Sequence, residues 1–110
     1  MSGEDTLAGE TGIEEIDRII HEPARLNIML YLYVVEKADF TFLVRKTGLT
    51  RGNLSVHLQK LEQSGYVEIL KEFQQRKPHT LVRLTQRGRD AFDQYRVQIL
   101  GVLGSLGTAQ

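Results

Sequence analysis

Apolar residues recur at helical spacing over most of this chain, and in two short runs they follow strand spacing. Ile13, Ile16 and Ile20 predict a short helix over about residues 13–20. Pro23 suits the first turn of a second helix, which should end near Lys37. That helix would turn one apolar stripe to the core: Leu26, Met29, Leu30 and Tyr33.

Two helices joined by a tight turn are predicted next. Thr41 is the expected N-cap of a short helix through Thr47, and Gly48 can supply the left-handed residue that ends it. Thr50 should cap the following helix, which ends at Gly65. Its apolar stripe has the i, i+4, i+7 spacing: Leu54, Leu58 and Leu61.

A hairpin and a last helix complete the pattern. Residues 66–73 (YVEILKEF) and 81–85 (LVRLT) read as two strands around the basic loop 74–80, because Pro78 cannot continue a central strand. Thr85 should cap the last helix. We therefore expect an α+β fold, mainly α, that is a winged helix-turn-helix with a two-stranded β-hairpin wing. The terminal helices would form a dimer interface.

The net charge of zero hides a segregation along the chain. Residues 1–44 carry three basic and nine acidic side chains, whereas residues 45–89 carry ten basic and three acidic ones. The basic block coincides with the helix-turn-helix and hairpin, which favours one basic face and a DNA partner. Chance clustering on solvated faces is the alternative.

A helix that enters a major groove must bury one side and leave the other free. Here the free side is polar and short, and Asn and Gln side chains can bridge an adenine edge. Gly52 adds no bulk, so the backbone can approach DNA closely. An ordinary solvated helix face is the alternative. The candidate DNA contacts are Thr50, Arg51, Gly52, Asn53, Ser55, Val56, Gln59 and Lys60.

The basic loop is the candidate wing, because adjacent cations at a stiffened hairpin tip suit phosphate or minor-groove contact. A soluble hairpin tip is the alternative. His57, at the edge of the apolar stripe, could bond within the domain or to a phosphate. Lys46 could contact DNA or complement its helix dipole. These further candidates are Gln75, Arg76, Lys77, His79, Arg45 and Lys46.

The first and last helices carry more apolar residues than a small winged core needs. Packing between two copies would bury them, double the DNA contacts and favour a two-fold related site. Packing of the two helices against each other is the alternative. The dimer hypothesis names Ile13, Ile16, Ile20, Phe92, Tyr95, Ile99, Val102, Leu103 and Leu106.

Several functional classes find no support in this sequence. Without cysteine, thiolate metal sites, disulfides and cysteine nucleophiles are excluded. The histidines lack metal-site spacing and no catalytic motif occurs, so we expect no metal, no cofactor and no enzyme. We expect residues 1–12 to form a flexible acidic tail rather than a signal peptide. Residues 13–106 should form one domain. Since no apolar run approaches the roughly 20 residues that span a bilayer, a soluble cytoplasmic protein is expected.

Three stretches, Leu49–Val67, Lys71–Thr80 and Leu84–Arg89, resemble small winged helix-turn-helix transcriptional regulators. The resemblance is to the ArsR- and MarR-like superfamily, closest to its compact prokaryotic subgroup, and covers roughly residues 13–103. It implies dimerisation through terminal helices and sequence-specific DNA binding, usually for repression. The missing cysteines depart from the related metal and redox sensors. No residue identifies an effector, so a small-molecule effector is an open question.

The leading hypothesis is therefore a homodimeric regulator that binds specific sequences of double-stranded DNA, as a repressor and without catalysis. Residues of about 50–64 would read the major groove, and residues of about 73–80 would contact the backbone or minor groove. The alternative is a winged-helix adaptor that binds other proteins and no specific DNA. The basic face argues against this alternative.

Overall fold

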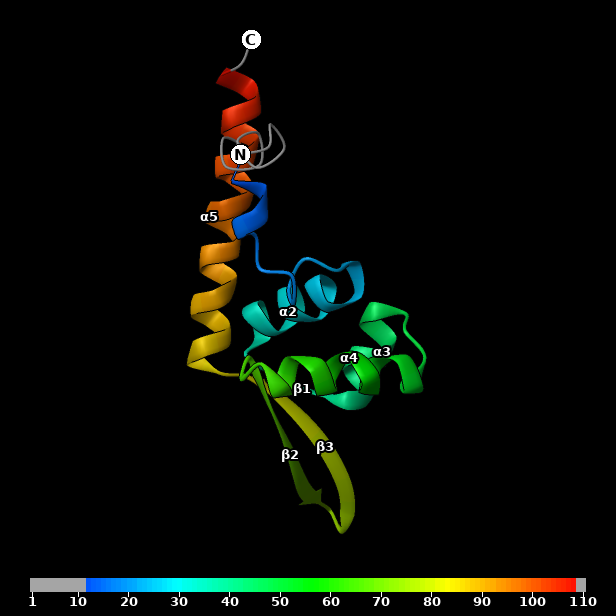
Figure 1. Ribbon diagram of the computed structural model, residues 1–110. Coiled ribbons are helices and arrows are strands. Elements are labelled where there is room, and N and C mark those ends of the chain that lie inside the picture. The colour runs from blue at the N-terminus through cyan, green and yellow to red at the C-terminus, as the bar shows by residue number, and fades with distance from the viewer. Residues whose placement is uncertain (1–11, 109–110) are drawn as a thin grey trace.

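The computed structural model describes residues 12–108, so the predicted tail lies, apart from Gly12, outside the described residues. The elements in chain order are η1 (Ile13–Glu15), α2 (Pro23–Val35), β1 (Lys37–Asp39), α3 (Phe40–Thr47), α4 (Arg51–Gln63), β2 (Val67–Gln74), β3 (Lys77–Leu84) and α5 (Gln86–Thr108). Helix α5 extends from the helical core in one direction and the β2–β3 hairpin extends in the other (Figure 1). The molecule is elongated, with principal extents of 60 × 23 × 23 Å.

The prediction of a helix over residues 13–20 is wrong, because only the three-residue 3₁₀ turn η1 forms there. Asp17 provides the physical reason. Its Oδ1 accepts hydrogen bonds from the backbone N–H groups of Ile19 at 2.9 Å and Ile20 at 3.2 Å, so a side-chain turn replaces the helix. Its Oδ2 accepts from the Tyr66 hydroxyl at 2.5 Å. Burial, together with this carboxylate, raises the pKa of Tyr66 to about 12.

Helix α2 begins at Pro23 as predicted, but it ends at Val35 rather than near Lys37. Glu36 follows with a positive φ of 68°, which breaks the helix. Lys37 then opens β1, a strand that the sequence did not predict, because three residues are too few to show an alternating pattern. The sheet therefore has three antiparallel strands in the order β1-β3-β2.

The start of α3 also differs from the prediction. Asp39 Oδ1 accepts a hydrogen bond from the backbone N–H of Thr41 at 2.7 Å, so Asp39 is the N-cap and the helix begins at Phe40. Thr41 is thus inside the helix rather than its cap. Because Asp39 is also the last residue of β1, the sheet and the helix-turn-helix join without a loop.

The predicted loop over 74–80 shrinks to a two-residue turn. Gln75 and Arg76 have φ values of 52° and 66°, which is the backbone of a type I′ hairpin turn. Strand β3 begins at Lys77, so Pro78 lies inside a strand, opposite Phe73. Strand β1 pairs with β3 only at residues 81–83, so it does not reach Pro78. On the β2 side, Phe73–Pro78 is the non-hydrogen-bonded pair that follows the hydrogen-bonded Gln74–Lys77 pair at the turn. The missing N–H of Pro78 therefore removes no hydrogen bond of the sheet.

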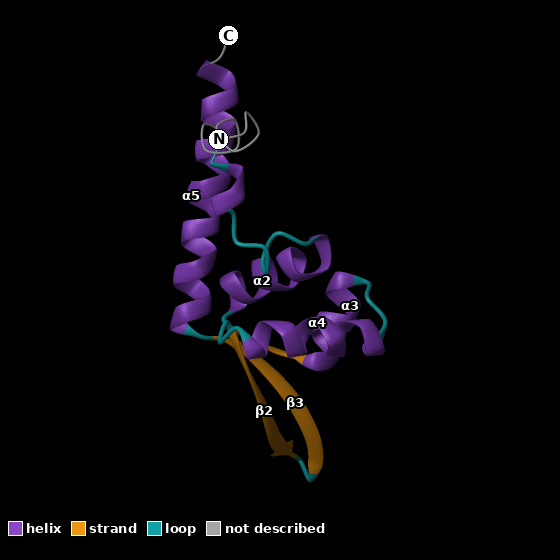
Figure 2. Ribbon diagram, viewed as in Figure 1, coloured by secondary structure: helices purple, strands orange, loops and turns teal. Residues whose placement is uncertain are grey.

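Helices α2, α3 and α4 pack over the base of the sheet, and the hairpin leaves this core as a free ribbon (Figure 2). The side chains at the centre are apolar and fully enclosed. They include Ile28, Leu32, Leu43, Leu54, Leu58, Leu61 and Val82. Within residues 12–108, no helix combines the length and apolarity needed to cross a bilayer.

The start of α5 is held by its cap, as predicted. Thr85 Oγ1 accepts from the Gly88 N–H at 2.9 Å and donates to the Gly65 carbonyl at 2.6 Å. A Cβ on Gly88 would stand 2.1 Å from the Tyr66 carbonyl oxygen, so only glycine permits this approach of α5 to the start of β2. This close contact sets the direction in which α5 leaves the core.

Candidate nucleic-acid interface

The turn between α3 and α4 is set by two local signals. Gly48 ends α3 with a left-handed φ of 72°, and its N–H donates to the Val44 carbonyl. Thr50 Oγ1 accepts the backbone N–H of Asn53 at 3.1 Å and so caps α4. Both predictions are confirmed. The turn gives α4 a defined direction before its exposed face begins.

Helix α4 has two faces of opposite character. Its three leucines at 54, 58 and 61 are at most 1% exposed, so the helix is anchored to the core. The opposite side carries no large side chain except cations and amides, and Val56 is 53% exposed there. The structure places the predicted contacts on this exposed side: Thr50, Arg51, Gly52, Asn53, Ser55, Val56, Gln59 and Lys60.

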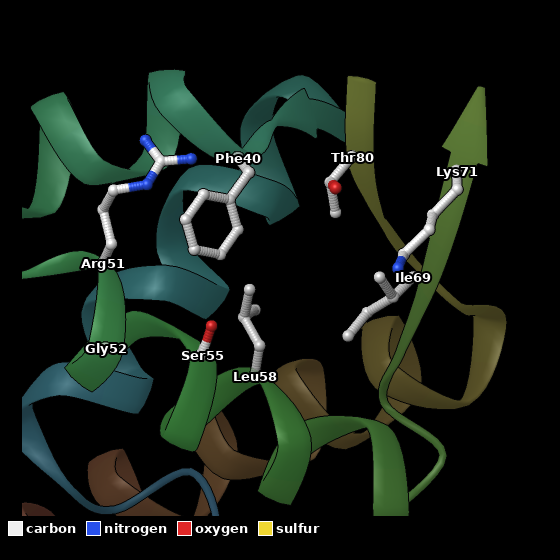
Figure 3. Close-up of a pocket in the computed structure, with 8 residues that line it drawn as sticks. All are labelled: Phe40, Arg51, Gly52, Ser55, Leu58, Ile69, Lys71 and Thr80. Carbon is white, nitrogen blue, oxygen red and sulfur yellow. The ribbon is translucent and has the colours of Figure 1, made fainter. Parts of the chain in front are cut away.

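Arg51 is oriented by an aromatic ring. Its guanidinium carbon lies 4.8 Å from the centroid of Phe40, a cation–π distance. Phe40 is the first residue of α3. Its ring stands beside the N-terminus of α4 (Figure 3). Phe40 was not among the predicted contacts, and recognising Asp39 as the N-cap would have placed it at the start of α3.

His57 bonds within the domain, which is one of its two predicted roles. Its Nδ1 lies 3.3 Å from Arg25 Nη1 and 3.5 Å from Glu22 Oε2. Burial opposes the charge on Glu22, but the backbone N–H groups of Arg25 and Ala24 hold the pKa of that carboxyl below its ordinary value. The cluster therefore ties α4 to the N-cap of α2, and His57 is a structural residue here.

The two cations at the end of α3 are exposed. Lys46 Nζ lies 5.7 Å from the Phe42 ring centroid, while the Lys46 carbonyl accepts the Tyr31 hydroxyl at 3.2 Å. Both Arg45 and Lys46 occupy the last turn, where positive charge complements the helix dipole. The structure is thus compatible with either predicted role of Lys46.

At the hairpin tip, the predicted wing residues separate. Gln75, Arg76 and Lys77 are exposed. His79 is directed elsewhere, because its Nδ1 lies 3.1 Å from Asp39 Oδ2. The hydrogen bond from His79 holds the pKa of Asp39 below its ordinary value, with backbone N–H donors adding to the effect. His79 therefore joins the hairpin to the start of α3.

A groove of about 470 Å³ separates α4 from the hairpin. Figure 3 shows Phe40, Leu58, Ile69, Lys71 and Thr80 directed into it from three sides. Arg51, Gly52 and Ser55 complete the lining. Lys71 was not predicted as a contact, although alternation along β2 assigns it to the same face as Ile69. Thr80 was expected in the loop of the wing and lies instead on β3, on this same face.

The dimer hypothesis requires a correction. Four of its nine residues are already buried in the single chain, with exposed fractions of 8% or less: Ile16, Ile20, Phe92 and Tyr95. They pack in the core, and the Tyr95 hydroxyl lies 2.8 Å from His21 Nδ1. This is the alternative in which the two terminal segments pack on each other. Ile99 and Val102 are half-buried, whereas Ile13, Leu103 and Leu106 are exposed.

Among the described residues 12–108, no group of three or more His, Asp or Glu side chains could hold a metal ion. The interface instead combines cations, amides, hydroxyls and small apolar surfaces. Side chains of this kind contact phosphates and base edges.

Comparisons with known proteins agree with this geometry. A family description of winged helix DNA-binding domains matches residues 24–101. An uncharacterized protein of Methanocaldococcus jannaschii is 39% identical over 83 residues, which cover 76% of this chain and 90% of that protein. The structure of a transcriptional regulator homologue from Pyrococcus horikoshii OT3 matches with a TM-score of 0.81 and 31% identity, over 89% of this chain and 97% of that chain.

The fold also extends to more distant proteins. Overoxidized AbfR, solved bound to DNA, has a TM-score of 0.57 and 19% identity, over 88% of this chain and 65% of that chain. At this identity the likeness shows the fold alone. The family match covers well over half of the chain and the M. jannaschii relative is similar over most of its length. The chain therefore belongs to the winged helix DNA-binding domain family.

Proposed function

We propose that this protein is a sequence-specific DNA-binding regulator of transcription that acts as a homodimer and represses its target genes. In this proposal α4 reads the major groove and the hairpin contacts the backbone or minor groove. The observation that carries it is the division of α4 into a fully buried leucine face and an exposed face of amides, hydroxyls and cations. Such a helix is anchored well enough to position base contacts.

The side chains of α4 suit different base edges. The amide of Asn53 or of Gln59 can donate one hydrogen bond to an adenine and accept another from it. Val56 offers a small apolar surface to a thymine methyl. Arg51 can reach guanine or phosphate from the N-terminal end, and its stacking on Phe40 reduces the freedom it would lose on binding. AbfR shares this fold and was solved bound to DNA, which supports the same use of the fold here.

The homodimer is supported by the apolar surface of α5. Four of its residues are 54–64% exposed in the single chain: Val97, Leu100, Leu103 and Leu106. An exposed apolar row of this length on one helix is typical of a protein–protein interface. A two-fold arrangement of two chains would bury this row and place two copies of α4 on related half-sites.

The first experiment is a selection from fragmented genomic DNA at about 150 mM salt with competitor DNA. Enrichment of a few loci that share an inverted repeat is the expected result. Uniform retention would instead indicate a protein that coats DNA without sequence preference. No retention by folded protein would contradict the proposal and favour the adaptor.

Two variants test the assignment of roles. Asn53→Ala should change the preferred sequence, whereas Arg76→Ala combined with Lys77→Ala should weaken binding to all sequences and reduce the salt slope by about 1.8 for two phosphate contacts. An unchanged slope in the double variant would contradict the role of the hairpin tip.

The dimer has its own test by sedimentation. Leu100→Glu combined with Leu103→Glu should yield monomers at concentrations where the wild type is dimeric, because two carboxylates would enter the apolar contact. Gln63→Glu, at an exposed position on α4, is the control for added charge. A dimeric Leu100/Leu103 variant would exclude this face of α5.

A further inference from the structure

The register of the hairpin divides its side chains into two faces, because residues directly opposite in an antiparallel pair point to the same side. We call the face that borders α4 the inner face and the other the outer face. The inner face consists of the pairs Val67–Leu84, Ile69–Val82, Lys71–Thr80 and Phe73–Pro78. The outer face consists of Glu68–Arg83, Leu70–Leu81, Glu72–His79 and Gln74–Lys77.

Every acidic residue of the hairpin lies on the outer face. There Glu68 binds Arg83 at 2.6 Å, and His79 bonds to Asp39 at 3.1 Å. Three of the polar groups on this face, Glu68, Arg83 and His79, are thus used within the protein. Because carboxylates repel phosphates, the outer face, apart from the Gln74–Lys77 pair at the tip, is the poorer surface for DNA.

The inner face has no acidic residue and continues the lining of the groove beside α4. Its lower pairs are core residues, with Val67 and Val82 almost fully buried. Lys71 and Thr80 come next, and both line the groove with Ser55 of α4 (Figure 3). Within residues 12–108, no carboxylate lies within 4 Å of the Lys71 ammonium group. This cation is therefore available to a phosphate.

The outermost inner-face pair is apolar. Phe73 is 79% exposed, and Pro78 lies opposite it across the two strands. An aromatic ring held in water at the end of a hairpin gains from burial against another surface. Apolar side chains of DNA-binding proteins use such burial in the minor groove, where they pack on sugars or enter a base step.

We propose that one sugar-phosphate strand of the DNA runs along the inner face of the hairpin. In this arrangement Lys71 neutralises a phosphate where the strand crosses from the major to the minor groove. The Thr80 hydroxyl donates to the same strand, and the Phe73 ring packs on the sugars of the minor groove. The proposal rests on the proposed function and assigns contacts to residues outside α4 and the hairpin tip.

The test is the affinity of the full chain for a labelled duplex of random sequence, measured by anisotropy between about 50 and 200 mM salt. Lys71→Ala should weaken binding and reduce the salt slope by about 0.9, the value for one phosphate contact. Arg83→Ala is the matched control, because it also removes one cation but from the outer face. Its salt slope should stay at the wild-type value. A slope for Lys71→Ala equal to that of the wild type would overturn the phosphate contact.

Phe73→Ala should weaken binding by about tenfold, which is typical of one aromatic contact to nucleic acid, and leave the salt slope unchanged. Val34→Ala is the control, because Val34 is also 79% exposed but lies on α2. Both positions are exposed, so the variants should keep the melting temperature of the wild type. Wild-type affinity in Phe73→Ala would overturn the aromatic contact.

A spectroscopic readout separates direct contact from an indirect effect. The chain has no tryptophan, so Phe73→Trp introduces a single tryptophan at the proposed contact, and long-wavelength excitation selects it over the four tyrosines. Its fluorescence should change when duplex DNA is added, whereas that of Val34→Trp should not. If wild-type protein binds no DNA, the proposed function fails and this proposal fails with it. If wild type binds while both inner-face variants bind equally well, only the path along the hairpin is refuted.

Discussion

Alanine at position 52 should stabilise the fold and weaken DNA binding at the same time. Apart from its chain neighbours and the nearby backbone of α4 itself, no heavy atom lies within 4 Å of the position that a Cβ on Gly52 would occupy, so the substitution meets open space. Glycine within a helix costs about 0.5–1 kcal/mol relative to alanine. For a chain of 110 residues, Gly52→Ala should therefore raise the melting temperature by about 2–5 °C.

The same methyl group would point into the proposed DNA contact. Gly52 lies between Arg51 and Ser55 on the groove beside α4, where we expect the backbone to approach DNA closely. An added methyl in a tight contact costs about 1 kcal/mol or more, which lowers affinity by about fivefold or more. Circular dichroism melts and anisotropy titrations on the enriched genomic fragments measure the two effects separately.

Gly101→Ala provides the matched control, because Gly101 lies in α5 and its Cβ would also meet open space. It should stabilise by a similar amount at equal protein concentration. Because Gly101 lies beside the proposed dimer face of α5, DNA affinity is compared with protein that sedimentation shows to be dimeric, and it should then equal that of the wild type. A lower melting temperature for Gly52→Ala would refute the open environment. Wild-type affinity in a stabilised Gly52→Ala variant would refute close approach of α4 to DNA.

Three further predictions concern stability. Gly88→Ala should cost about 1–3 kcal/mol or more, seen as a lower urea midpoint, because its Cβ would meet the Tyr66 carbonyl at 2.1 Å. Thr50→Ala should cost about 1 kcal/mol through loss of the α4 cap, whereas Thr50→Ser should restore most of it in the same assay. In the folded chain the pKa of Asp39 lies below its ordinary value of 3.8. The Asp39 carboxylate therefore stabilises the fold fully above pH 3.8, and this contribution is lost as the pH falls through the folded pKa. Asp39→Asn, which also removes the acceptor for His79, should flatten the dependence of the unfolding free energy on acid pH; parallel acid profiles would contradict this.

Local signals predicted most of the helical frame correctly. The leucine stripe of α4 depends only on spacing within one helix. Gly48, Thr50 and Thr85 were also identified correctly, because caps act on backbone groups within a few residues. For the same reason, the helix-turn-helix order and the mainly helical α+β fold class could be derived from the chain alone.

The hairpin was predicted as an element but not in its details. The sequence indicated two strands and a basic tip, yet Pro78 suggested a longer loop than the two-residue turn that forms. Proline is excluded only where its N–H would enter a ladder, and that depends on the register of the pair. Register in turn follows from the turn and the pairing, which no single strand encodes.

Tertiary structure alone decided the remaining features, because each depends on residues far apart in the sequence. Strand β1 exists only through its pairing with β3, and His79 bonds to Asp39 across 40 positions. The groove formed by Phe40, Lys71 and Thr80 requires three elements to meet. The sequence determined the apolar face of α4, but its predicted core stripe for α2 was partly wrong, because Leu30 is 47% exposed while Ile28 and Leu32 are fully buried. Only packing decided that Lys71 and Thr80 line a groove beside α4, while several isoleucine and aromatic side chains fill the core of a single chain.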